Sequence, residues 1–163
     1  MKLHIENMDR EFALKILDWK YEKPYDYYNN DPTAEDLKEL LDGTYFALVN
    51  EEDLVGFFCI GKNAQIPDGH QYGVYVEPYL DIGFGMDPDL TGKGYGYEFC
   101  SFILKSIEEK YKKTTFRLTV AKFNARAIHL YEKLGFEKTD EFPAYSREYW
   151  TMIKYTESAS ILK

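Results

Sequence analysis

Three glycines occupy alternate positions in the stretch 90-LTGKGYGYEFCSF-102, at Gly92, Gly94 and Gly96. Apolar side chains follow them at the spacing of an amphipathic helix. Glycine is a poor helix former, so its concentration where a helix begins indicates that the backbone itself is used there. The first amides of a helix have no partner within the helix and readily bind phosphate. The stretch therefore predicts a phosphate-binding turn.

The spacing of the glycines excludes two common phosphate motifs. A Walker loop needs Ser or Thr after its Gly-Lys pair, whereas Lys93 is followed by Gly94. A dinucleotide fingerprint needs G-x-G-x-x-G, whereas this stretch has G-x-G-x-G. Two interpretations stay open on the residues alone: an ordinary flexible turn, or backbone amides that hold a pyrophosphate.

Two stretches resemble the signatures of one enzyme family, the GNAT acyltransferases. The stretch 86-MDPDLTGKGYGYEF-99 is similar to the family's acetyl-CoA-binding motif, Gln/Arg-x-x-Gly-x-Gly/Ala. The stretch 124-NARAIHLYEKLGF-136 is similar to its second signature, Asn-x-x-Ala-x-x-x-Tyr-x-x-x-Gly-Phe. Thr91 departs from the pattern, because the family usually has Gln or Arg there. The likeness extends to the order of elements over residues 3–155.

The resemblance implies acetyl-CoA as the acyl donor. By this likeness the extended chain before the glycines would bind the pantetheine arm, and the amides of the glycine turn would hold the pyrophosphate. Asn124 would reach the pantetheine, and the small side chain of Ala127 would let the cofactor pass close to its helix. The implied binding residues are Phe84, Gly85, Met86, Thr91, Gly92, Lys93, Gly94, Tyr95, Gly96, Tyr97, Asn124, Ala127 and Lys133.

The resemblance also implies direct transfer from the thioester to an amine. Tyr131 matches the family position that gives a proton to the departing thiolate, and a phenol is protonated at neutral pH. The alternative for Tyr131 is a tyrosine that only packs in the core. Asp81 is the first candidate for the general base, with Glu77 and His70 as alternatives, and an exposed carboxylate is the ordinary interpretation of Asp81 and Glu77. No metal site is expected.

The acceptor is expected to be a cationic amine. Two segments that this fold uses for the acceptor, residues 21–31 and 62–81, mix tyrosines with acids, as a cation-binding cleft does. A soluble loop would have the same composition. The amine is left open between an aminoglycoside-like or polyamine-like molecule and a peptide N-terminus or lysine. The alternative function is a non-catalytic acyl-CoA-binding sensor of the same fold.

Charge and composition bound the partners. The net charge of −8 disfavours nucleic acid or an anionic membrane. Residues 1–89 hold 19 Asp and Glu against 7 Lys and Arg, and residues 90–163 hold 9 against 13. No run is apolar enough for a membrane span, and the start lacks a signal-peptide pattern, so a cytoplasmic protein is expected. Cys59 and Cys100 are expected to be buried thiols. A monomer and a homodimer both stay possible.

The elements that must position these residues follow from periodicity. The predicted order is a strand, two helices, three strands, a helix, a strand, a helix and two strands. This order predicts an α/β (α+β) fold, with one mixed, mostly antiparallel sheet and helices on both faces. Strand 79–86, helix 94–111 and strand 116–121 would form a βαβ unit with the glycines at its connection. We expect one domain over 1–163, with a tail at 156–163 that is flexible or packs in a dimer.

Overall fold

The computed structural model describes residues 1–30, 32–111 and 114–156. Its helices and strands follow the predicted order, with four short 3-10 turns between them. The strands are β1 (Leu3–Asn7), β2 (Tyr45–Asn50), β3 (Asp53–Ile60), β4 (Leu80–Met86), β5 (Thr115–Ala121), β6 (Glu137–Ala144) and β7 (Arg147–Tyr155). The helices are α1 (Arg10–Asp18), α2 (Ala34–Leu40), α3 (Tyr95–Lys110) and α4 (Ala125–Lys133).

The seven strands form one mixed sheet in the order β1-β2-β3-β4-β5-β7-β6. The pairs β1–β2, β2–β3, β5–β7 and β6–β7 are antiparallel, whereas β4 and β5 are parallel. A parallel neighbour requires a crossover connection, and α3 supplies it. The predicted mixed α/β fold is confirmed.

The chain divides into two compact units. Unit 1 contains Met1–Cys59 and Phe84–Phe99, and unit 2 contains Ile60–Gly83 and the described residues from Cys100 onward. Strand β4 and helix α3 each begin in one unit and continue in the other. The expectation of one domain over 1–163 stays a prediction, and most of the tail 156–163 lies outside the described residues, which end at Thr156.

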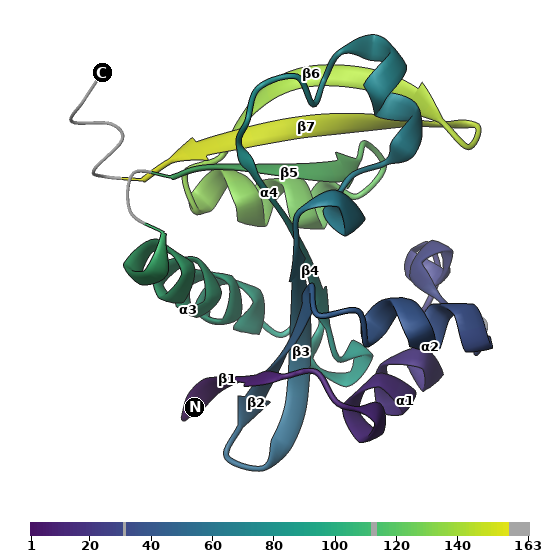
Figure 1. The fold of residues 1–163 in the computed structure, drawn as a ribbon, viewed down its shortest axis with the longest axis vertical. Coiled ribbons are helices and arrows are strands. Elements are labelled where there is room, and N and C mark those ends of the chain that lie inside the picture. Colours follow the sequence, from purple (N-terminus) through teal and green to yellow (C-terminus); the bar gives the residue numbers. More distant parts are fainter. Residues whose placement is uncertain (31, 112–113, 157–163) are drawn as a thin grey trace. The chain divides into compact units, whose positions relative to one another are not determined.

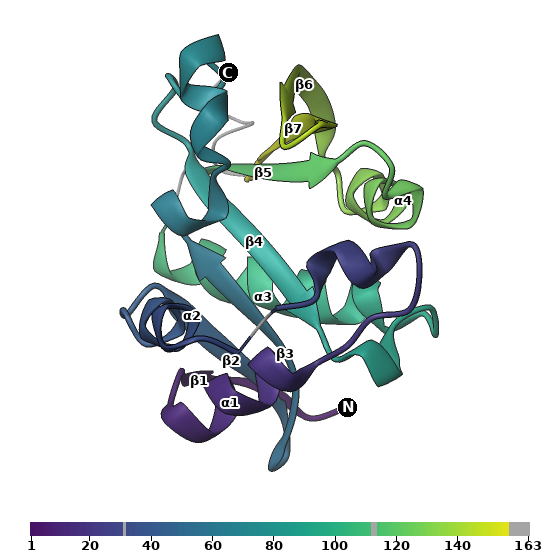
Figure 2. The same ribbon diagram turned by 90° about the vertical axis from the view of Figure 1, so that its right-hand side faces the viewer.

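Unit 1 is built on the β1–β2–β3 meander. The β2–β3 hairpin pairs Asn50 with Asp53, as the polar turn at 50–53 predicts. Asp9 caps α1 by accepting from the amide of Phe12 at 2.8 Å, and Thr33 caps α2 by accepting from Asp36 at 3.1 Å. Helices α1 and α2 lie on one side of these strands (Figures 1 and 2). Side chains that α1 buries are Ala13, Ile16 and Leu17.

Unit 2 is built on the antiparallel strands β5, β7 and β6, and α4 runs beside them (Figure 1). Its largest fully buried side chains are Phe116, Phe136, Phe142, Ile82, Leu104 and Met152. The ladder of β6 with β7 continues to Ala144, which lies opposite Arg147. In the part of the chain that the structure describes, no helix is long and apolar enough to cross a membrane.

The main difference from prediction lies between β3 and β4. The sequence there reads as a polar loop, but the chain forms two 3-10 turns, at Lys62–Ala64 and Pro67–Tyr72. Proline at the first turn position and Gly73 in the left-handed conformation bound the second turn. These turns have too few residues for helical periodicity to register, so the sequence pattern alone does not indicate them.

Candidate functional site

The glycine turn of unit 1 has the backbone geometry of an anion site. Gly92 and Gly94 adopt positive φ angles of 72° and 87°, and α3 begins at the next residue, Tyr95. Left-handed residues of this kind turn successive amides toward one side and form a nest for anions. A Cβ atom built on Gly94 meets no atom within 4 Å, so internal packing does not require a glycine there. The positive φ angle, and not packing, therefore accounts for glycine at position 94, and the assignment of this turn to phosphate stays a prediction.

The side chains around this turn differ in their availability. Lys93 and Tyr97 are exposed, whereas Tyr95 stacks on Phe99 with ring centroids 5.9 Å apart. The hydroxyl of Thr91 donates to the carbonyl of Pro88 at 2.8 Å, and its amide donates to the same oxygen at 3.3 Å. Both donors of Thr91 are therefore occupied within the turn, and the prediction that Thr91 binds phosphate stays a prediction.

The end of β4 in unit 1 carries the residues implied to bind pantetheine, Phe84, Gly85 and Met86. Gly85 packs directly against the ring of Phe57, which leaves no space for a side chain at this position. The carbonyl of Met86 accepts a hydrogen bond of 2.7 Å from the hydroxyl of Tyr21. Burial, with a smaller contribution from the Asp87 carboxylate, raises the pKa of Tyr21, so this phenol remains a donor. Packing thus explains Gly85 without any ligand.

The segment after α1, also in unit 1, is the first of the two predicted acceptor segments. It contains the 3-10 turn Tyr25–Tyr28 and a cis peptide bond before Pro24. The amide of Tyr21 donates to the side chain of Asn29 at 2.7 Å, which joins the two ends of the segment. The rings of Tyr21 and Tyr28 meet edge to face at 6.5 Å. Asp31, the last predicted residue of this segment, lies outside the described residues.

Helix α4 of unit 2 carries the second signature. Asn124 is its N-cap, and the side-chain oxygen accepts from the amide of Ala127 at 3.0 Å. Asparagine is among the preferred residues at this position, so the signature residue has a structural task that sequence reasoning did not assign to it. Ala127 is half-buried, and Lys133 is the exposed last residue of the helix.

Tyr131 lies one turn after Ala127 on the same helix. It is half-buried, and its ring meets that of Phe136 edge to face at 6.1 Å. The carbonyl of Tyr131 accepts from the amide of Phe136 at 3.0 Å, where Gly135 with a φ angle of 99° ends the helix. The signature residues Tyr131, Gly135 and Phe136 therefore form one local structure, the helix end that supports the tyrosine ring.

Asp81, the first candidate for the general base, lies in a buried ion pair. Its side chain is 4% exposed and forms a bidentate ion pair with Arg117, with Oδ1–Nε at 2.7 Å and Oδ2–Nη2 at 2.8 Å. Gln65 donates to Oδ2 at 2.8 Å as well. Charge-assisted, bidentate hydrogen bonds of this kind are strong and fix the orientation of both side chains. The role of Asp81 as general base stays a prediction.

The other two base candidates lie in the same unit. Glu77 is exposed, and its backbone carbonyl accepts from Arg117 at 3.0 Å. His70 is exposed, and its Nε2 lies 2.9 Å from the side-chain oxygen of Gln65. Sequence reasoning missed Arg117, which contacts the carboxylate of Asp81 and the backbone of Glu77. Its one available signal was a charged residue in an otherwise apolar strand, 116-FRLTVA-121.

No group of three His, Cys, Asp or Glu side chains is arranged to hold a metal ion in residues 1–30, 32–111 and 114–156. The two cysteines are buried free thiols, as predicted. The chemistry that these two units offer therefore consists of anion-binding amides at a helix start, a half-buried phenol on α4, and carboxylates with aromatic rings on two connecting segments.

Comparisons with known proteins point to one family. Residues 11–136 match the model of the Acetyltransferase (GNAT) family. The chain is also 31% identical over 107 residues to the spermine/spermidine N(1)-acetyltransferase of Bacillus subtilis (strain 168), a match that covers 66% of this chain and 68% of that protein.

Solved structures share the fold. An aminoglycoside acetyltransferase in complex with coenzyme A superposes with a TM-score of 0.70 at 15% identity, covering 98% of both chains. Mutant forms of the spermidine/spermine N-acetyltransferase from Vibrio cholerae superpose with a TM-score of 0.66 at 17% identity, covering 99% of both chains. At these identities the likeness concerns the fold alone.

Proposed function

Because this chain belongs to the Acetyltransferase (GNAT) family and is an acetyl-CoA-dependent N-acetyltransferase of a primary amine, we propose that its acceptor is a small polycationic amine of the polyamine class. The observation that carries this proposal is the 31% identity to a spermine/spermidine N(1)-acetyltransferase over two thirds of both chains. The same relationship favours the catalytic interpretation over a non-catalytic acyl-CoA sensor.

The charge of the chain supports a polycationic acceptor. Residues 1–89 are strongly acidic, and they include both connecting segments that are rich in tyrosine. A polyamine carries several ammonium groups separated by short apolar chains, which carboxylates and aromatic faces bind together. Lysine or a peptide N-terminus would offer one such charge. The acidic, tyrosine-rich composition therefore favours the polyamine over a protein acceptor.

Acetyl-CoA supplies the activated acetyl group as a thioester. We assign its pyrophosphate to the amides of the turn, and its pantetheine arm to the extended backbone of Phe84–Met86. The open space at Gly94 and the positive φ angles of Gly92 and Gly94 support the first assignment. The proposed phosphate-binding residues are Gly92, Lys93, Gly94, Tyr95, Gly96 and Tyr97. Asn124, Ala127 and Lys133 remain proposed cofactor contacts on α4.

The transfer itself requires three events. The neutral amine nitrogen bonds to the thioester carbonyl carbon, the carbon–sulfur bond breaks, and the sulfur receives a proton. The hydroxyl of Tyr131 donates that proton in our proposal, since a phenol is protonated at neutral pH. The amine gives up its own proton, for which Glu77 is the exposed carboxylate among the predicted bases. A cytoplasmic location fits this use of acetyl-CoA and the free thiols.

An acetylation assay tests the proposed acceptor. The protein is incubated with acetyl-CoA and, in separate reactions, spermidine, spermine, an aminoglycoside and a lysine-containing peptide, and the release of free thiol is followed. We expect kcat/KM to be highest for spermidine or spermine. A higher kcat/KM for the aminoglycoside or the peptide would contradict the polyamine assignment but leave the N-acetyltransferase activity intact.

A further inference from the structure

One buried guanidinium in unit 2 holds the segment that connects β3 to β4, residues 62–79. Arg117 on β5 is 3% exposed and faces Asp81 on the adjacent strand, to which it is paired in register. Its remaining nitrogen, Nη1, donates to the carbonyl oxygens of Glu77 at 3.0 Å and Val74 at 3.4 Å. The same side chain thus joins the sheet to the backbone of the connecting segment.

The aromatic residues of the segment complete this attachment. The guanidinium carbon of Arg117 lies 5.0 Å from the ring centroid of Tyr75 and 5.6 Å from that of Tyr79, within the range of cation–π contacts. The hydroxyl of Tyr75 accepts from the amide of Ile66 at 2.9 Å and lies 2.8 Å from the hydroxyl of Thr119. One tyrosine therefore connects the start of the segment to β5.

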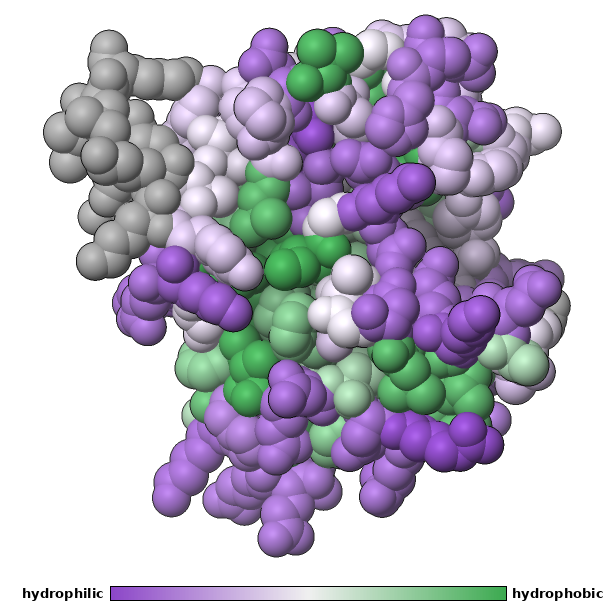
Figure 3. All heavy atoms as spheres, viewed as in Figure 1, coloured by the Kyte–Doolittle hydropathy of each residue, from purple (hydrophilic) through white to green (hydrophobic). Residues whose placement is uncertain are grey.

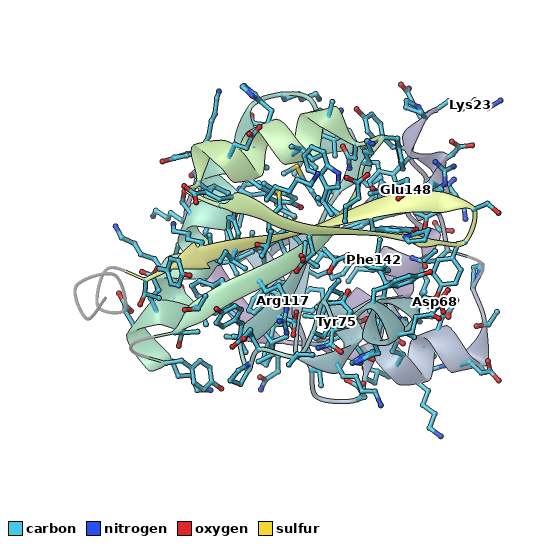
Figure 4. The ribbon with its side chains drawn as sticks, turned by 90° about the horizontal axis from the view of Figure 1, so that it is seen from above. Lys23, Asp68, Tyr75, Arg117, Phe142 and Glu148 are labelled. Atoms are coloured by element: carbon cyan, nitrogen blue, oxygen red, sulfur yellow. The ribbon has the colours of Figure 1, made fainter. Side chains whose placement is uncertain are left out.

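The segment is also packed too closely to adopt many conformations. A Cβ atom on Gly69 would lie 2.7 Å from the ring of Tyr75 and 3.2 Å from that of Phe142. The rings of Tyr75 and Phe142 meet edge to face at 6.2 Å, and Figure 4 shows Arg117, Tyr75 and Phe142 grouped together. Hydrogen bonds, an ion pair and close packing all specify the same conformation.

The outer side of the same segment is open to solvent. Val76 is 78% exposed and Tyr72 is 50% exposed, although both are apolar or aromatic. An apolar spot interrupts the polar surface over the segment that precedes β4 (Figure 3). Asp68 and Glu77 are exposed acids of the same segment. Loops that a rigid scaffold holds in position commonly carry binding residues.

The Arg117–Asp81 pair is poorly explained by stability alone. A buried ion pair loses the hydration of both charges, so apolar residues of similar size often stabilise a protein as well or better. The pair instead fixes the orientation of the guanidinium. Two hydrogen bonds to the Asp81 carboxylate hold its plane, so that the third nitrogen, Nη1, faces two backbone carbonyl oxygens. These oxygens belong to Val74 and Glu77.

We propose that Arg117 is a positioning residue for the acceptor amine, which keeps segment 62–79 in the conformation that binds it. This inference rests on the proposed function for the identity of the acceptor. Asp81 orients the guanidinium, and Gln65 orients Asp81. Loss of the guanidinium removes the hydrogen bond to the carbonyl of Glu77. The backbone at Glu77 is then less constrained, and the Glu77 carboxylate is no longer held in one position.

The test compares three variants of the pair with one control, in the full chain. Arg117→Met removes the charge, Arg117→Lys keeps the charge without the planar fork, and Asp81→Asn keeps the shape without the carboxylate. The control is Glu141→Gln on β6, which breaks an exposed ion pair with Lys122 at 3.1 Å and Lys138 at 2.8 Å in the same unit. The measurements are KM for spermidine, the Kd of acetyl-CoA and amide hydrogen exchange.

We expect Arg117→Met to raise KM for spermidine about tenfold or more, the effect of losing charge-assisted hydrogen bonds of ordinary strength. The Kd of acetyl-CoA should change by less than about twofold, because the phosphate-binding amides are backbone groups of unit 1. Exchange at the amides of Ile66 and Gly69 should accelerate, with no change at Ala13 in α1. Arg117→Lys and Asp81→Asn should give intermediate values of KM, and Glu141→Gln should match the wild type.

Two results would overturn the proposal. One is faster exchange in segment 62–79 with an unchanged KM for spermidine, which would show that the segment does not position the acceptor. The other is a parallel loss of acetyl-CoA binding and slower turnover in all three variants, which would indicate general destabilisation. If Arg117→Met does not fold, the same measurements on Arg117→Lys and Asp81→Asn, namely KM for spermidine, the Kd of acetyl-CoA and amide exchange, test the proposal. A wild-type protein that binds acetyl-CoA but acetylates no polyamine contradicts the proposed function instead.

Discussion

The hydroxyl of Tyr21 donates a hydrogen bond of 2.7 Å to the backbone carbonyl of Met86, across 65 residues of sequence. Tyr21 belongs to the tyrosine-rich segment after α1, and Met86 is the last residue of β4. Both lie in unit 1. One hydrogen bond therefore joins a proposed acceptor segment to the end of β4, which we assign to the acyl donor.

Replacement of Tyr21 by Phe removes this hydrogen bond and leaves the ring. The phenol is half-buried, so the Met86 carbonyl loses a partner that water replaces only in part. We expect the free energy of unfolding to fall by about 1–2 kcal/mol. If the bond also fixes the acceptor segment, KM for spermidine should rise by more than the Kd of acetyl-CoA. Urea denaturation and steady-state kinetics measure the two effects.

Tyr145→Phe is the matched control, because Tyr145 lies in the β6–β7 turn and is 59% exposed. An exposed hydroxyl binds water in both the folded and the unfolded state. Its removal should therefore change the unfolding free energy by less than about 0.5 kcal/mol. Equal losses in Tyr21→Phe and Tyr145→Phe would contradict a structural role for the Tyr21–Met86 bond.

Gly94 and Gly43 allow a controlled test of the phosphate turn. Both have positive φ angles, 87° and 94°, and at neither does an added Cβ atom meet anything within 4 Å. Alanine at either position therefore has the same backbone strain, on the order of 1–2 kcal/mol, and no steric clash. Only Gly94 lies in the turn that we assign to phosphate.

We expect Gly94→Ala to weaken acetyl-CoA binding about tenfold, because a methyl group obstructs the approach of phosphate to the amides. Gly43→Ala, which follows α2, should lose similar stability with unchanged affinity. Calorimetric titration with acetyl-CoA and thermal unfolding of both variants provide the measurements. An unchanged Kd in Gly94→Ala would mean that these amides do not bind the cofactor.

Tyr131→Phe tests the proton donor. A positioned acid contributes about 100-fold or more to the rate of such a transfer, so kcat should fall by about that factor. The Kd of acetyl-CoA should stay within about twofold, because the ring and its contact with Phe136 remain. Tyr111→Phe, at an exposed position after α3, should have the activity of the wild type. A Tyr131→Phe variant with full kcat would refute the assignment, whatever its stability.

The fold was largely predictable from the sequence, for reasons that lie in local periodicity. Helix caps such as those of Asp9 and Thr33, and apolar strand runs such as 44–49, each depend on a few neighbouring residues. The two signatures also single out the glycine turn and Tyr131 as candidates, because their spacing is local to one helix start and one helix. Such features need no knowledge of which distant residues meet.

The parts that sequence reasoning missed depend on distant contacts. The ion pair of Asp81 depends on Arg117, which lies 36 residues later in the sequence. Gly85 resembled a ligand-contact glycine, but the Phe57 ring occupies the space next to it. Asn124 is a signature residue whose side chain caps its own helix. In each case the neighbour is set by strand pairing or packing, which no single stretch of sequence shows.

Cys100 provides a prediction of pH dependence. Burial raises the pKa of its thiol from 9.0 to about 12. The folded state therefore holds the thiol proton more tightly than the unfolded state. The resulting contribution to stability is complete below pH 9 and is lost progressively as the pH rises from 9 to about 12.

The measurement is the unfolding free energy of the wild type and of Cys100→Ala at pH 8 and at pH 10.5. For each pH unit above the unfolded-state pKa, this thiol lowers the unfolding free energy of the wild type by at most about 1.4 kcal/mol. The wild type should therefore lose about 1–2 kcal/mol more than Cys100→Ala across this range, because other groups titrate equally in both. The native thiol should also resist alkylation at pH 8 until denaturant is added. Equal losses in the two proteins, or rapid alkylation of the native thiol, would show that the Cys100 thiol is not buried in the folded protein.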